Sequence, residues 1–426
     1  MNKVCRVAVI GCGARGCDTY ANLMAQKPDV YKIEALCDLS EEKLQKYGEM
    51  FGVPEERRFT SDEVFFEKKR ADVLVVATLD GQHVEPCVKA LSLGYDVLLE
   101  KPITDNIEEC KKVLSAQKQY GGKVLVCHVL RYAPAFLKVK ELLDNGTVGK
   151  LVSITATENV AYWHYAHSYV RGNWRNRQIA DPMILAKCCH DLDLLQFYAQ
   201  SKCESVSSVG DLMFFKKENA PEGATQRCLD CPHADDCVYS AKRIYLDAWK
   251  VSRPENVWPY NVLQTEIPTT EENLTKALQS GDYGRCVFAC DNDVVDHQLT
   301  QMTFENGVKA SLNMMAFTRN GGRIMKFYGT HGEIVLDEES DFIDVKKFGE
   351  KTERLSIAEL LKNAASEGGY LHGGGDYYLI ETLAEVVAGT AKGETSLEAS
   401  IESHLMGICA EESRLQGGKL IYLHKD

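Results

Sequence analysis

The sequence predicts an α/β protein in two parts: a doubly wound parallel sheet, followed by an α/β domain with a large, mainly antiparallel open-faced sheet. Three observations support this prediction. Apolar runs of strand length alternate with helix-compatible stretches over the first 128 residues, a glycine-rich turn follows the first run, and the later runs are separated mainly by turns. Alternating strands and helices are typical of parallel sheets, whereas strands joined by turns are typical of antiparallel ones.

The N-terminal part repeats a strand and a helix several times. Short apolar runs predict the strands, and the more polar stretches between them are compatible with helices. We expect strands at 3–10, 31–38, 71–78, 95–100 and 123–128, and helices at 18–26, 41–52, 83–94 and 106–121. These elements define a first domain over residues 1–128.

The remaining chain, residues 129–426, is expected to form the second domain, with a cysteine-rich insertion near 220–290. Its strand-like segments follow one another with few helices between them, which favours antiparallel pairing. We expect strands at 151–160, 206–215, 297–307, 308–317, 323–330 and 332–338, and helices at 182–200, 376–389 and 397–413.

Composition excludes several functional classes. The 426 residues carry a net charge of −13, which disfavours nucleic acid or an anionic membrane as a partner. No apolar run approaches the roughly 20 residues that span a bilayer, and the N-terminus enters a strand pattern without a signal-peptide layout. Sixteen cysteines scattered through strand and helix patterns are typical of reduced thiols, so we expect a cytoplasmic protein.

The glycine turn predicts a dinucleotide site. Gly11, Gly13 and Gly16 form GxGxxG between a strand and a helix, with Ala14 and Arg15 inside the turn, and Asp38 ends the next strand. In a Rossmann domain such glycines let the backbone approach a pyrophosphate, while the acid accepts a hydrogen bond from a ribose hydroxyl. A carboxylate there repels a 2′-phosphate, so NAD is favoured over NADP. Arg15 could reach a phosphate or remain a solvated charge, and the turn could simply pack a helix on a strand.

Two other strands end in polar residues at the same edge of the predicted sheet. Thr78 and His83 follow one strand, and Glu100 and Lys101 follow the next, so we assign all four to the cofactor site. Lys101 at a strand tip over the nicotinamide could hold, or give a proton to, an oxygen of the substrate. Glu100 could pair with a neighbouring cation or with the ribose. The alternative for Lys101 is a side chain that merely leaves the strand for water.

In their order, the segments GCGARG, CD, ATLDGQH, EKP and RYAPAFLKVKELLDNGTVGK resemble those of the Gfo/Idh/MocA oxidoreductases. The resemblance implies a Rossmann domain followed by an open-faced sheet domain, and NAD(P)-dependent oxidation or reduction of sugars and polyols. It also implies a catalytic lysine at Lys101, an active-site histidine at His190, and a homo-oligomer, a dimer or tetramer, packed through the sheet.

The predicted helix 182–200 contributes the second half of the site. One stripe of the helix is apolar, whereas Lys187, His190 and Asp191 fall on another stripe and are expected to point together away from the core. His190 could take the substrate hydroxyl proton, with Asp191 or Asp193 holding its ring. Relatives active on polyols usually carry an aspartate four residues before this histidine. Ala186 stands there instead, so Lys187 could supply the polar group. Because the usual set of lysine, aspartate and histidine is incomplete, the substrate could differ from the sugars and polyols usual in the family.

Residues 163–176 are dense in aromatic and basic side chains. Rings stack on sugar faces and guanidinium groups bind hydroxyls or carboxylates, so this stretch is a candidate substrate loop or, alternatively, a subunit contact. Its candidate residues are Trp163, His164, His167, Arg171, Trp174 and Arg175, and His297 and His372 are further candidates outside it.

A cysteine cluster in the insertion predicts a metal site. Cys228, Cys231 and Cys237 lie in a turn-rich segment, with Cys286 or Cys290 as the preferred fourth ligand and His233 as the second choice. Four soft ligands would make a structural zinc site that leaves no position open for substrate. An iron–sulfur cluster has similar thiol spacing, and three reduced thiols without metal are the simpler alternative.

Three functions are compatible with these features. The first is an NAD-dependent dehydrogenase of a sugar or polyol, in which His190 removes the hydroxyl proton and Lys101 stabilises the oxygen. The second is a glycoside-cleaving enzyme that retains NAD and uses oxidation, elimination, hydration and reduction in turn. The third is a non-catalytic dinucleotide-dependent binding protein.

Overall fold

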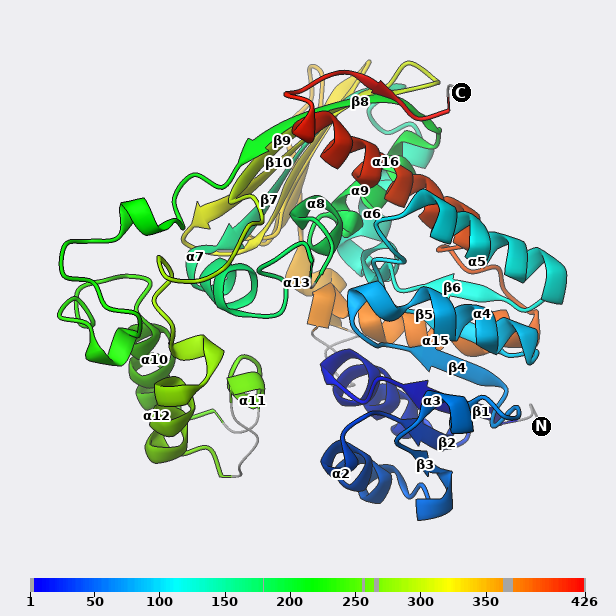
Figure 1. The fold of residues 1–426 in the computed structure, drawn as a ribbon. Helices are drawn as coiled ribbons and strands as arrows, with labels where there is room; N and C mark the ends of the chain where they lie inside the picture. Colours follow the sequence, from blue (N-terminus) through cyan, green and yellow to red (C-terminus); the bar gives the residue numbers. More distant parts are fainter. Residues whose placement is uncertain (1–3, 179, 255–256, 264–267, 363–370, 425–426) are drawn as a thin grey trace.

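Six parallel strands form the first sheet, in the order β3-β2-β1-β4-β5-β6. The computed structural model describes residues 4–178, 180–254, 257–263, 268–362 and 371–424. This sheet confirms the doubly wound parallel domain (Figure 1). Its strands are β1 (Cys5–Ile10), β2 (Tyr31–Cys37), β3 (Arg58–Phe59), β4 (Val73–Val76), β5 (Asp96–Leu99) and β6 (Val124–Val126).

Helices cover both faces of this sheet. The apolar interior is divided into two layers, one on each face, because alternate strand residues point to opposite sides. One layer is closed by the π-helical η1 (Ala14–Ala21), which continues as α1 (Asn22–Ala25), and by α2 (Glu41–Phe51) and α15 (Gly375–Ala388). The other is closed by α3 (Asp62–Phe65), α4 (Val84–Ser92) and α5 (Ile107–Tyr120). The helix α15 therefore brings the chain back to the first sheet 250 residues after leaving it.

The second sheet has nine strands in the order β14-β13-β12-β11-β7-β10-β9-β8-β15. Neighbouring strands are antiparallel except β7 and β10, which pair in parallel, with Ile154 opposite Ala310. This confirms the prediction of a mainly antiparallel second sheet. The strands are β7 (Leu151–Ala161), β8 (Cys203–Asp211), β9 (His297–Phe304), β10 (Lys309–Thr318), β11 (Gly322–Gly329), β12 (Gly332–Asp337), β13 (Phe342–Lys347), β14 (Glu353–Ser356) and β15 (Ile421–Tyr422).

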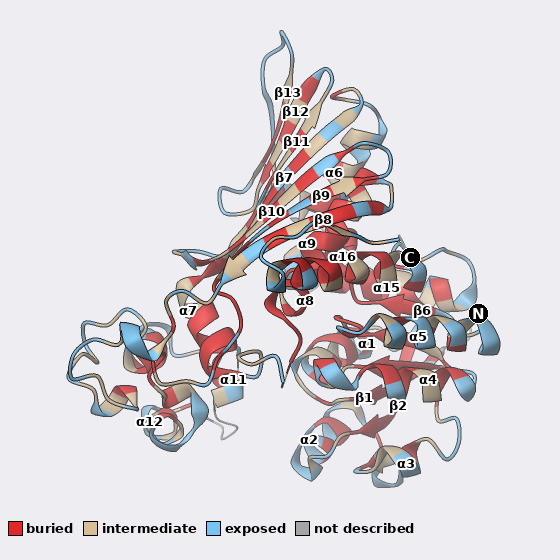
Figure 2. Ribbon diagram, turned by 45° about the horizontal axis from the view of Figure 1, so that its top comes forward, coloured by how far each residue is buried: buried red, intermediate tan, exposed pale blue. Residues whose placement is uncertain are grey.

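Helices line one face of the second sheet and leave much of the other open. The residues that point toward α6 (Pro134–Asp144), α9 (Cys189–Ala199) and α16 (Leu397–Leu415) are buried, and the alternate residues are partly or fully exposed (Figure 2). On the open face Val209 of β8 lies opposite Leu299 of β9, and these side chains are 47% and 51% exposed. An exposed apolar pair on an uncovered sheet is typical of an interaction surface.

Several local expectations needed correction. The predicted helix 182–200 is interrupted: α8 (Met183–Ala186) ends at Lys187, and α9 begins at Cys189. The predicted strand 206–215 begins and ends earlier, as β8. The insertion between β8 and β9 contains short helices that the sequence pattern did not indicate: η6 (Lys217–Asn219), η7 (Cys228–Asp230), η8 (Lys242–Asp247), α10 (Ala248–Ser252), α11 (Tyr260–Leu263), α12 (Glu271–Ser280) and η9 (Asp282–Gly284).

The remaining short helices connect the main elements. They are η2 (Glu55–Arg57), η3 (Asp80–Gln82), η4 (Val129–Tyr132), α7 (Tyr162–Tyr165), the π-helical η5 (Ala166–Arg171), α13 (Ile357–Leu360) and η10 (Leu371–Gly374). No helix in the described ranges combines the length and the apolar character needed to cross a bilayer.

Candidate active site

The glycine turn has the geometry of a dinucleotide cradle. Gly11 has φ +89°, and a β-carbon there would lie 2.3 Å from the Ala77 carbonyl oxygen, so only glycine fits. A β-carbon on Gly16 would lie 2.1 Å from the Gly11 carbonyl oxygen, which explains the close packing of helix on strand. Beside Gly13, in contrast, a β-carbon would meet no atom within 4 Å, so this backbone faces open space. The residues present therefore fit a pyrophosphate at the start of η1.

Asp38 stands next to this cradle at the end of β2. Its Oδ2 accepts a hydrogen bond from the Cys12 backbone N–H at 2.7 Å, and its Oδ1 accepts one from the Ser40 N–H at 2.9 Å. Lys43 Nζ lies 3.8 Å from Oδ2. The two backbone bonds fix the carboxylate at the turn, as a ribose-binding acid requires.

Arg15 is partly buried, and its guanidinium is paired with two carboxylates. Its Nε donates to Glu100 Oε1 at 2.7 Å, and a second guanidinium nitrogen donates to Asp376 Oδ1 at 2.6 Å and to the Tyr20 hydroxyl. The Tyr20 hydroxyl donates to the same Glu100 oxygen at 2.6 Å. Burial opposes ionisation of Glu100, but the charges of Arg15 and Lys101 lower its pKa to about 2. Glu100 thus pairs with a cation, the first of its two predicted roles.

Lys101 follows Glu100 at the tip of β5. The Lys101 backbone N–H donates to Glu100 Oε2 at 2.9 Å, which fixes the start of the Lys101–Pro102 turn. Burial, which lowers the pKa of Lys101, is outweighed by the neighbouring Cys189, Glu100 and Asp80, so the pKa is raised. Lys101 is therefore a cation at neutral pH and can stabilise a developing oxyanion.

His83 and Thr78 frame the neighbouring strand tip. The His83 ring lies between two backbone carbonyls, with Nδ1 2.6 Å from the Pro102 oxygen and Nε2 3.1 Å from the Thr78 oxygen. The Thr78 hydroxyl donates to the Gln82 oxygen at 3.0 Å. His83 therefore joins the two strand tips and supports the position of Lys101.

His190, in α9, faces the same region. It is 6% exposed, and its Nδ1 has no hydrogen-bond partner among the described residues. Its ring centroid lies 5.9 Å from that of His128 and 5.8 Å from that of His372. Burial and the nearby charge of Lys101 lower the pKa of His190 well below its ordinary value. The imidazole is therefore neutral and can accept a proton, while the neighbouring cation lowers its strength as a base.

The two aspartates expected to hold the His190 ring are engaged elsewhere, so this expectation was wrong. Asp191 accepts from Arg323 Nε at 2.8 Å, and Asp193 accepts from Arg131 Nε at 2.6 Å. Burial raises the pKa of Asp191 to about 7. The expected polar stripe is buried at His190 and Asp191 and partly buried at Lys187. Lys187 forms an ion pair with Glu158 at 3.0 Å, and Arg323 bridges Glu158 and Asp191. Lys187 and Asp191 thus belong to an interior charge network behind His190.

Asp80 and Asp181 are acids at this site that sequence reasoning missed. Asp80 follows β4, and its Oδ2 accepts from Trp174 Nε1 at 2.9 Å. Asp181 is 4% exposed, and its Oδ2 has no hydrogen-bond partner in the described structure. Burial and the charges of Asp80 and Asp105 raise the pKa of Asp181 to about 8, although Lys101 opposes this shift. Asp80 could have been found from its place at a strand tip, whereas Asp181 carries no such signal.

The candidate substrate loop is divided between the site and the insertion. Trp174 reaches the site through Asp80, whereas Arg171 is fully buried and donates to the carbonyl oxygens of Arg285 and Tyr239 at 2.7 Å each. The other loop residues pack toward the insertion. The rings of Trp163, His164 and His167 lie around Trp258, with centroids 5.0–5.2 Å from its ring. His167 also forms a hydrogen bond with Tyr245, and Arg175 forms an ion pair with Asp291. Arg171 and His167 are thus interior residues and would not contact a substrate in this arrangement.

His297 and His372 have different surroundings. His297 Nδ1 lies 2.8 Å from Asp296 Oδ1 at the start of β9. His372 Nδ1 lies 2.8 Å from Asp376 Oδ2, next to His190. Of the two, His372 therefore lies within the candidate active site.

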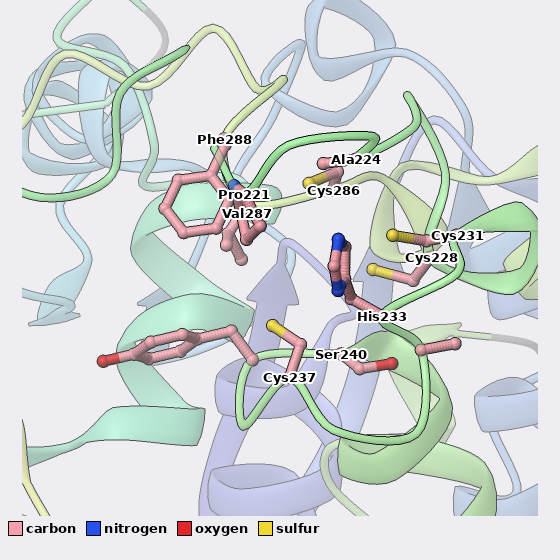
Figure 3. A pocket seen from close by; sticks show the side chains of 12 residues that line it. Pro221, Ala224, Cys228, Cys231, His233, Cys237, Ser240, Cys286, Val287 and Phe288 are labelled. Atoms are coloured by element: carbon pink, nitrogen blue, oxygen red, sulfur yellow. The ribbon is translucent and has the colours of Figure 1, made fainter. Parts of the chain in front are cut away.

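Four cysteines in the insertion line one small cavity of about 20 Å³, together with His233. Figure 3 shows the sulfur atoms of Cys228, Cys231, Cys237 and Cys286 around the His233 ring. The Cys290 thiol instead donates to the Cys286 carbonyl oxygen at 3.3 Å. As they stand, the described residues contain no group of three or more His, Cys, Asp or Glu side chains placed to hold a metal ion.

Comparisons with known proteins follow the same division of the chain. A family model described as an oxidoreductase family with an NAD-binding Rossmann fold matches residues 5–128, and its C-terminal alpha/beta domain matches residues 140–420. The putative oxidoreductase YteT of Bacillus subtilis is 26% identical over 385 residues, which cover 85% of this chain and 84% of YteT.

Two further similarities are more remote or partial. The 2,7-anhydro-N-acetylneuraminate hydratase of Mediterraneibacter gnavus is 26% identical over 35% of this chain and 39% of its own length. The WlbA dehydrogenase of Bordetella pertussis, solved with NADH and UDP-GlcNAcA, has a TM-score of 0.70 at 18% identity and covers 100% of this chain and 99% of its own. At this identity the last comparison shows the fold.

Proposed function

The chain belongs to the Gfo/Idh/MocA family of oxidoreductases, and from that premise we propose that it transfers hydride between a carbinol carbon of a sugar or polyol and the nicotinamide of NAD. The observation that carries the proposal is that Lys101, at the tip of β5, and His190, in α9, belong to one site, where His190 Nδ1 has no hydrogen-bond partner among the described residues. Lys101 is held as a cation, while His190 is held neutral with a free Nδ1. A fixed cation and a neutral base side by side are suited to removing a hydroxyl proton while stabilising the resulting oxygen.

The cofactor residues have separate roles in this proposal. Gly11, Gly13 and Gly16 would receive the pyrophosphate, and Asp38 would accept from the ribose, which favours NAD over NADP. Bound NAD supplies the hydride acceptor. Glu100, neutralised by Arg15, orients the Lys101 backbone and leaves the Lys101 ammonium for the substrate oxygen.

The substrate would approach between the strand tips and Trp174. Asp80 holds the Trp174 indole at the edge of the first sheet, and an indole face is a good platform for a sugar ring. His164 and Arg175 are proposed as secondary contacts, since they lie in the same loop. The aspartate missing at Ala186 has no evident replacement in Lys187, which is paired with Glu158.

A second candidate function is redox-assisted glycoside cleavage with retained NAD. Two observations support this alternative. The chain is partly similar to an anhydroneuraminate hydratase, and Ala186 stands where polyol-active relatives usually carry an aspartate. It requires the same proton acceptor and cation, followed by removal of a second proton next to the new carbonyl. The dehydrogenase is the better supported of the two, because its step needs only the groups already identified.

One experiment separates these functions. Purified protein is incubated with NAD and myo-inositol, free sugars or 4-nitrophenyl glycosides, and NADH and nitrophenol are followed in the same wells. NADH without nitrophenol supports the dehydrogenase, and nitrophenol without net NADH supports the alternative. If neither product forms while NAD binds, a non-catalytic binding protein becomes the better description.

We propose in addition that Cys228, Cys231, Cys237 and Cys286 bind a structural zinc ion. Thiolates are preferred zinc ligands, and these four sulfurs line one cavity although Cys286 is distant in sequence. Arg171 Nη2 donates a hydrogen bond to the Cys228 sulfur at 3.5 Å, which fixes this thiol at the cavity. Elemental analysis of protein purified without chelator should find zinc, whereas iron with sulfide would indicate a cluster.

We further propose a homo-oligomer, a dimer or tetramer, formed through the open face of the second sheet. The exposed pair of Val209 and Leu299 supports this assignment, since a second copy of the sheet would cover it. We place the protein in the cytoplasm, where sixteen cysteines stay reduced. Light scattering of the purified protein measures the oligomeric state directly.

A further inference from the structure

We infer that His372, held by Asp376, carries the proton taken up by His190 out to solvent; this inference rests on the proposed function. A dehydrogenase releases one proton for each hydride that it transfers from a carbinol. His190 is 6% exposed and would receive this proton in the interior. A base in that position needs a neighbour that can pass the proton to water.

His372 is the neighbour of His190 that reaches the surface. The two ring centroids lie 5.8 Å apart, and the His372 side chain is 37% exposed. This separation is within the reach of one bridging water molecule. The unpartnered Nδ1 of His190 is a nitrogen that such a relay could use.

The other neighbours of His190 lead into the interior. His128 is fully buried, and neither of its ring nitrogens has a hydrogen-bond partner in the described structure. Beyond it lies His404, at 5.5 Å between centroids, whose Nε2 accepts from the Ile103 N–H and whose Nδ1 bonds the Ser400 carbonyl oxygen. Because both nitrogens of His404 are bound to backbone, this branch offers no exit to solvent.

Charges around the two rings favour transfer in the outward direction. An imidazolium at His190 would be opposed by the charges of Lys101 and Arg323, which lower the pKa of His190 together with burial and with His372 and His128. His372 instead bonds the Asp376 carboxylate, 2.8 Å from its Nδ1. Burial opposes ionisation of Asp376, but Arg15 and His372 lower its pKa well below the ordinary value, so it remains a carboxylate. Cations thus oppose a proton on His190, whereas a carboxylate lies beside the His372 ring.

The proton balance of the proposed step is complete. The substrate O–H bond breaks and an N–H bond forms on His190, while the carbon bearing that oxygen gives its hydride to the nicotinamide and becomes a carbonyl. The proton then leaves His190 for Nε2 of His372, because Nδ1 is engaged with Asp376. From Nε2 it passes to water or buffer, and both rings return to their neutral state.

The substitution that tests this relay is His372→Asn. His372 has φ +50°, a left-handed conformation that asparagine tolerates better than most residues, so the backbone should be preserved. His424→Asn is the matched control, because His424 is 34% exposed and likewise pairs with a carboxylate, Glu402, at 2.9 Å. Retained NAD affinity and melting temperature verify that each variant is folded. If His372→Asn does not fold, His372→Gln is used in its place.

The measurement is NADH formation and proton release, followed together by absorbance and a pH indicator, with the best substrate of the polyol, sugar and nitrophenyl glycoside panel. We expect His372→Asn to lower kcat about tenfold or more with little change in KM. Added imidazole should restore the rate in proportion to its concentration, as a diffusible carrier replaces the missing ring. The control variant should behave like the wild type.

Three outcomes would overturn the relay. They are a wild-type rate in His372→Asn, a loss that imidazole does not restore in a folded variant, or an equal loss in His424→Asn. A wild-type protein that forms neither NADH nor nitrophenol would refute the proposed function itself, and the relay with it. Failure of the relay alone is recognised by an active wild-type enzyme.

Discussion

Trp174 Nε1 donates a hydrogen bond to Asp80 Oδ2 at 2.9 Å, and this contact joins the loop of the second domain to a strand tip of the first. Asp80 is buried, so its carboxylate depends on this donor and on nearby Lys101 and His83 for compensation. The indole N–H of Trp174 therefore fixes this part of the loop against the strand tip.

Replacing Trp174 with Phe should weaken substrate binding. The ring is retained, but one hydrogen bond to a charged group is lost, which corresponds to about tenfold in KM. Steady-state kinetics with NAD saturating should show this rise with NAD affinity unchanged. The control is Trp249→Phe, which removes a comparable indole bond, to the Pro254 oxygen, inside the insertion. Equal effects of the two variants would contradict a specific role for Trp174.

Lys101→Met should abolish most of the activity without preventing cofactor binding. Methionine keeps the length of the side chain but cannot stabilise an oxyanion, so kcat should fall by roughly 10²- to 10⁴-fold. NAD titration by calorimetry should give a dissociation constant within a few-fold of wild type. Lys111→Met, at an exposed site on α5, is the control. A wild-type rate in Lys101→Met would refute the assigned role.

Asp181 predicts a pH dependence of stability. Its pKa of about 8 lies above the value near 3.9 expected in the unfolded chain, so its contribution to stability is complete below about pH 4 and is lost as pH rises toward 8. Asp181→Asn mimics the protonated form, so the variant should unfold at a higher temperature than wild type at pH 9. The advantage should shrink toward pH 5.

The size of the expected effect of Asp181→Asn follows from the pKa difference, and an exposed aspartate provides the control. Each unit of pKa difference corresponds to about 1.4 kcal/mol in the free energy of unfolding. Asp29→Asn, at an exposed position, should leave the pH profile of the melting temperature unchanged. Parallel profiles for wild type and Asp181→Asn would mean that Asp181 is charged in the folded protein at neutral pH.

Cys286→Ser should remove the proposed zinc ion, and Cys290→Ser should not. The Cys286 sulfur lines the cavity with three others, whereas the Cys290 thiol bonds a backbone carbonyl. We expect metal content near zero and a lower melting temperature for the first variant only, since a closed zinc site stabilises a segment with little core. Identical metal content in the two variants would place the fourth ligand elsewhere.

The fold could be predicted from local patterns, because buried parallel strands are apolar runs and the glycine turn has a steric cause. The strand β13 and the edge strand β14 were missed, since charged side chains interrupt their alternation. The break at Lys187 was missed because the apolar spacing continues across it, while Lys187 pairs with Glu158 of β7.

Several single residues of the candidate site could be predicted from the sequence, but most of the contacts between them could not. Glu100 and Lys101 were found from their place at a strand tip, and the resemblance of the sequence to a known family indicated His190. Asp376, the partner of Arg15, lies 361 residues further along the chain, and no periodicity connects the two. Arg171 was misread as a substrate residue because burial of a guanidinium group is not visible in a sequence.

The return of α15 to the first sheet has a consequence for synthesis on the ribosome. Tyr377, Leu379 and Ile380 fill part of the apolar layer beneath β1 and β2, and the Tyr31 hydroxyl donates to the Ile380 oxygen at 2.6 Å. A nascent chain that has emerged only as far as residue 128 therefore leaves the α15 part of this layer uncovered and Arg15 without one of its two carboxylates. The nucleotide-binding half, although made first, becomes complete only when nearly the whole polypeptide has been translated.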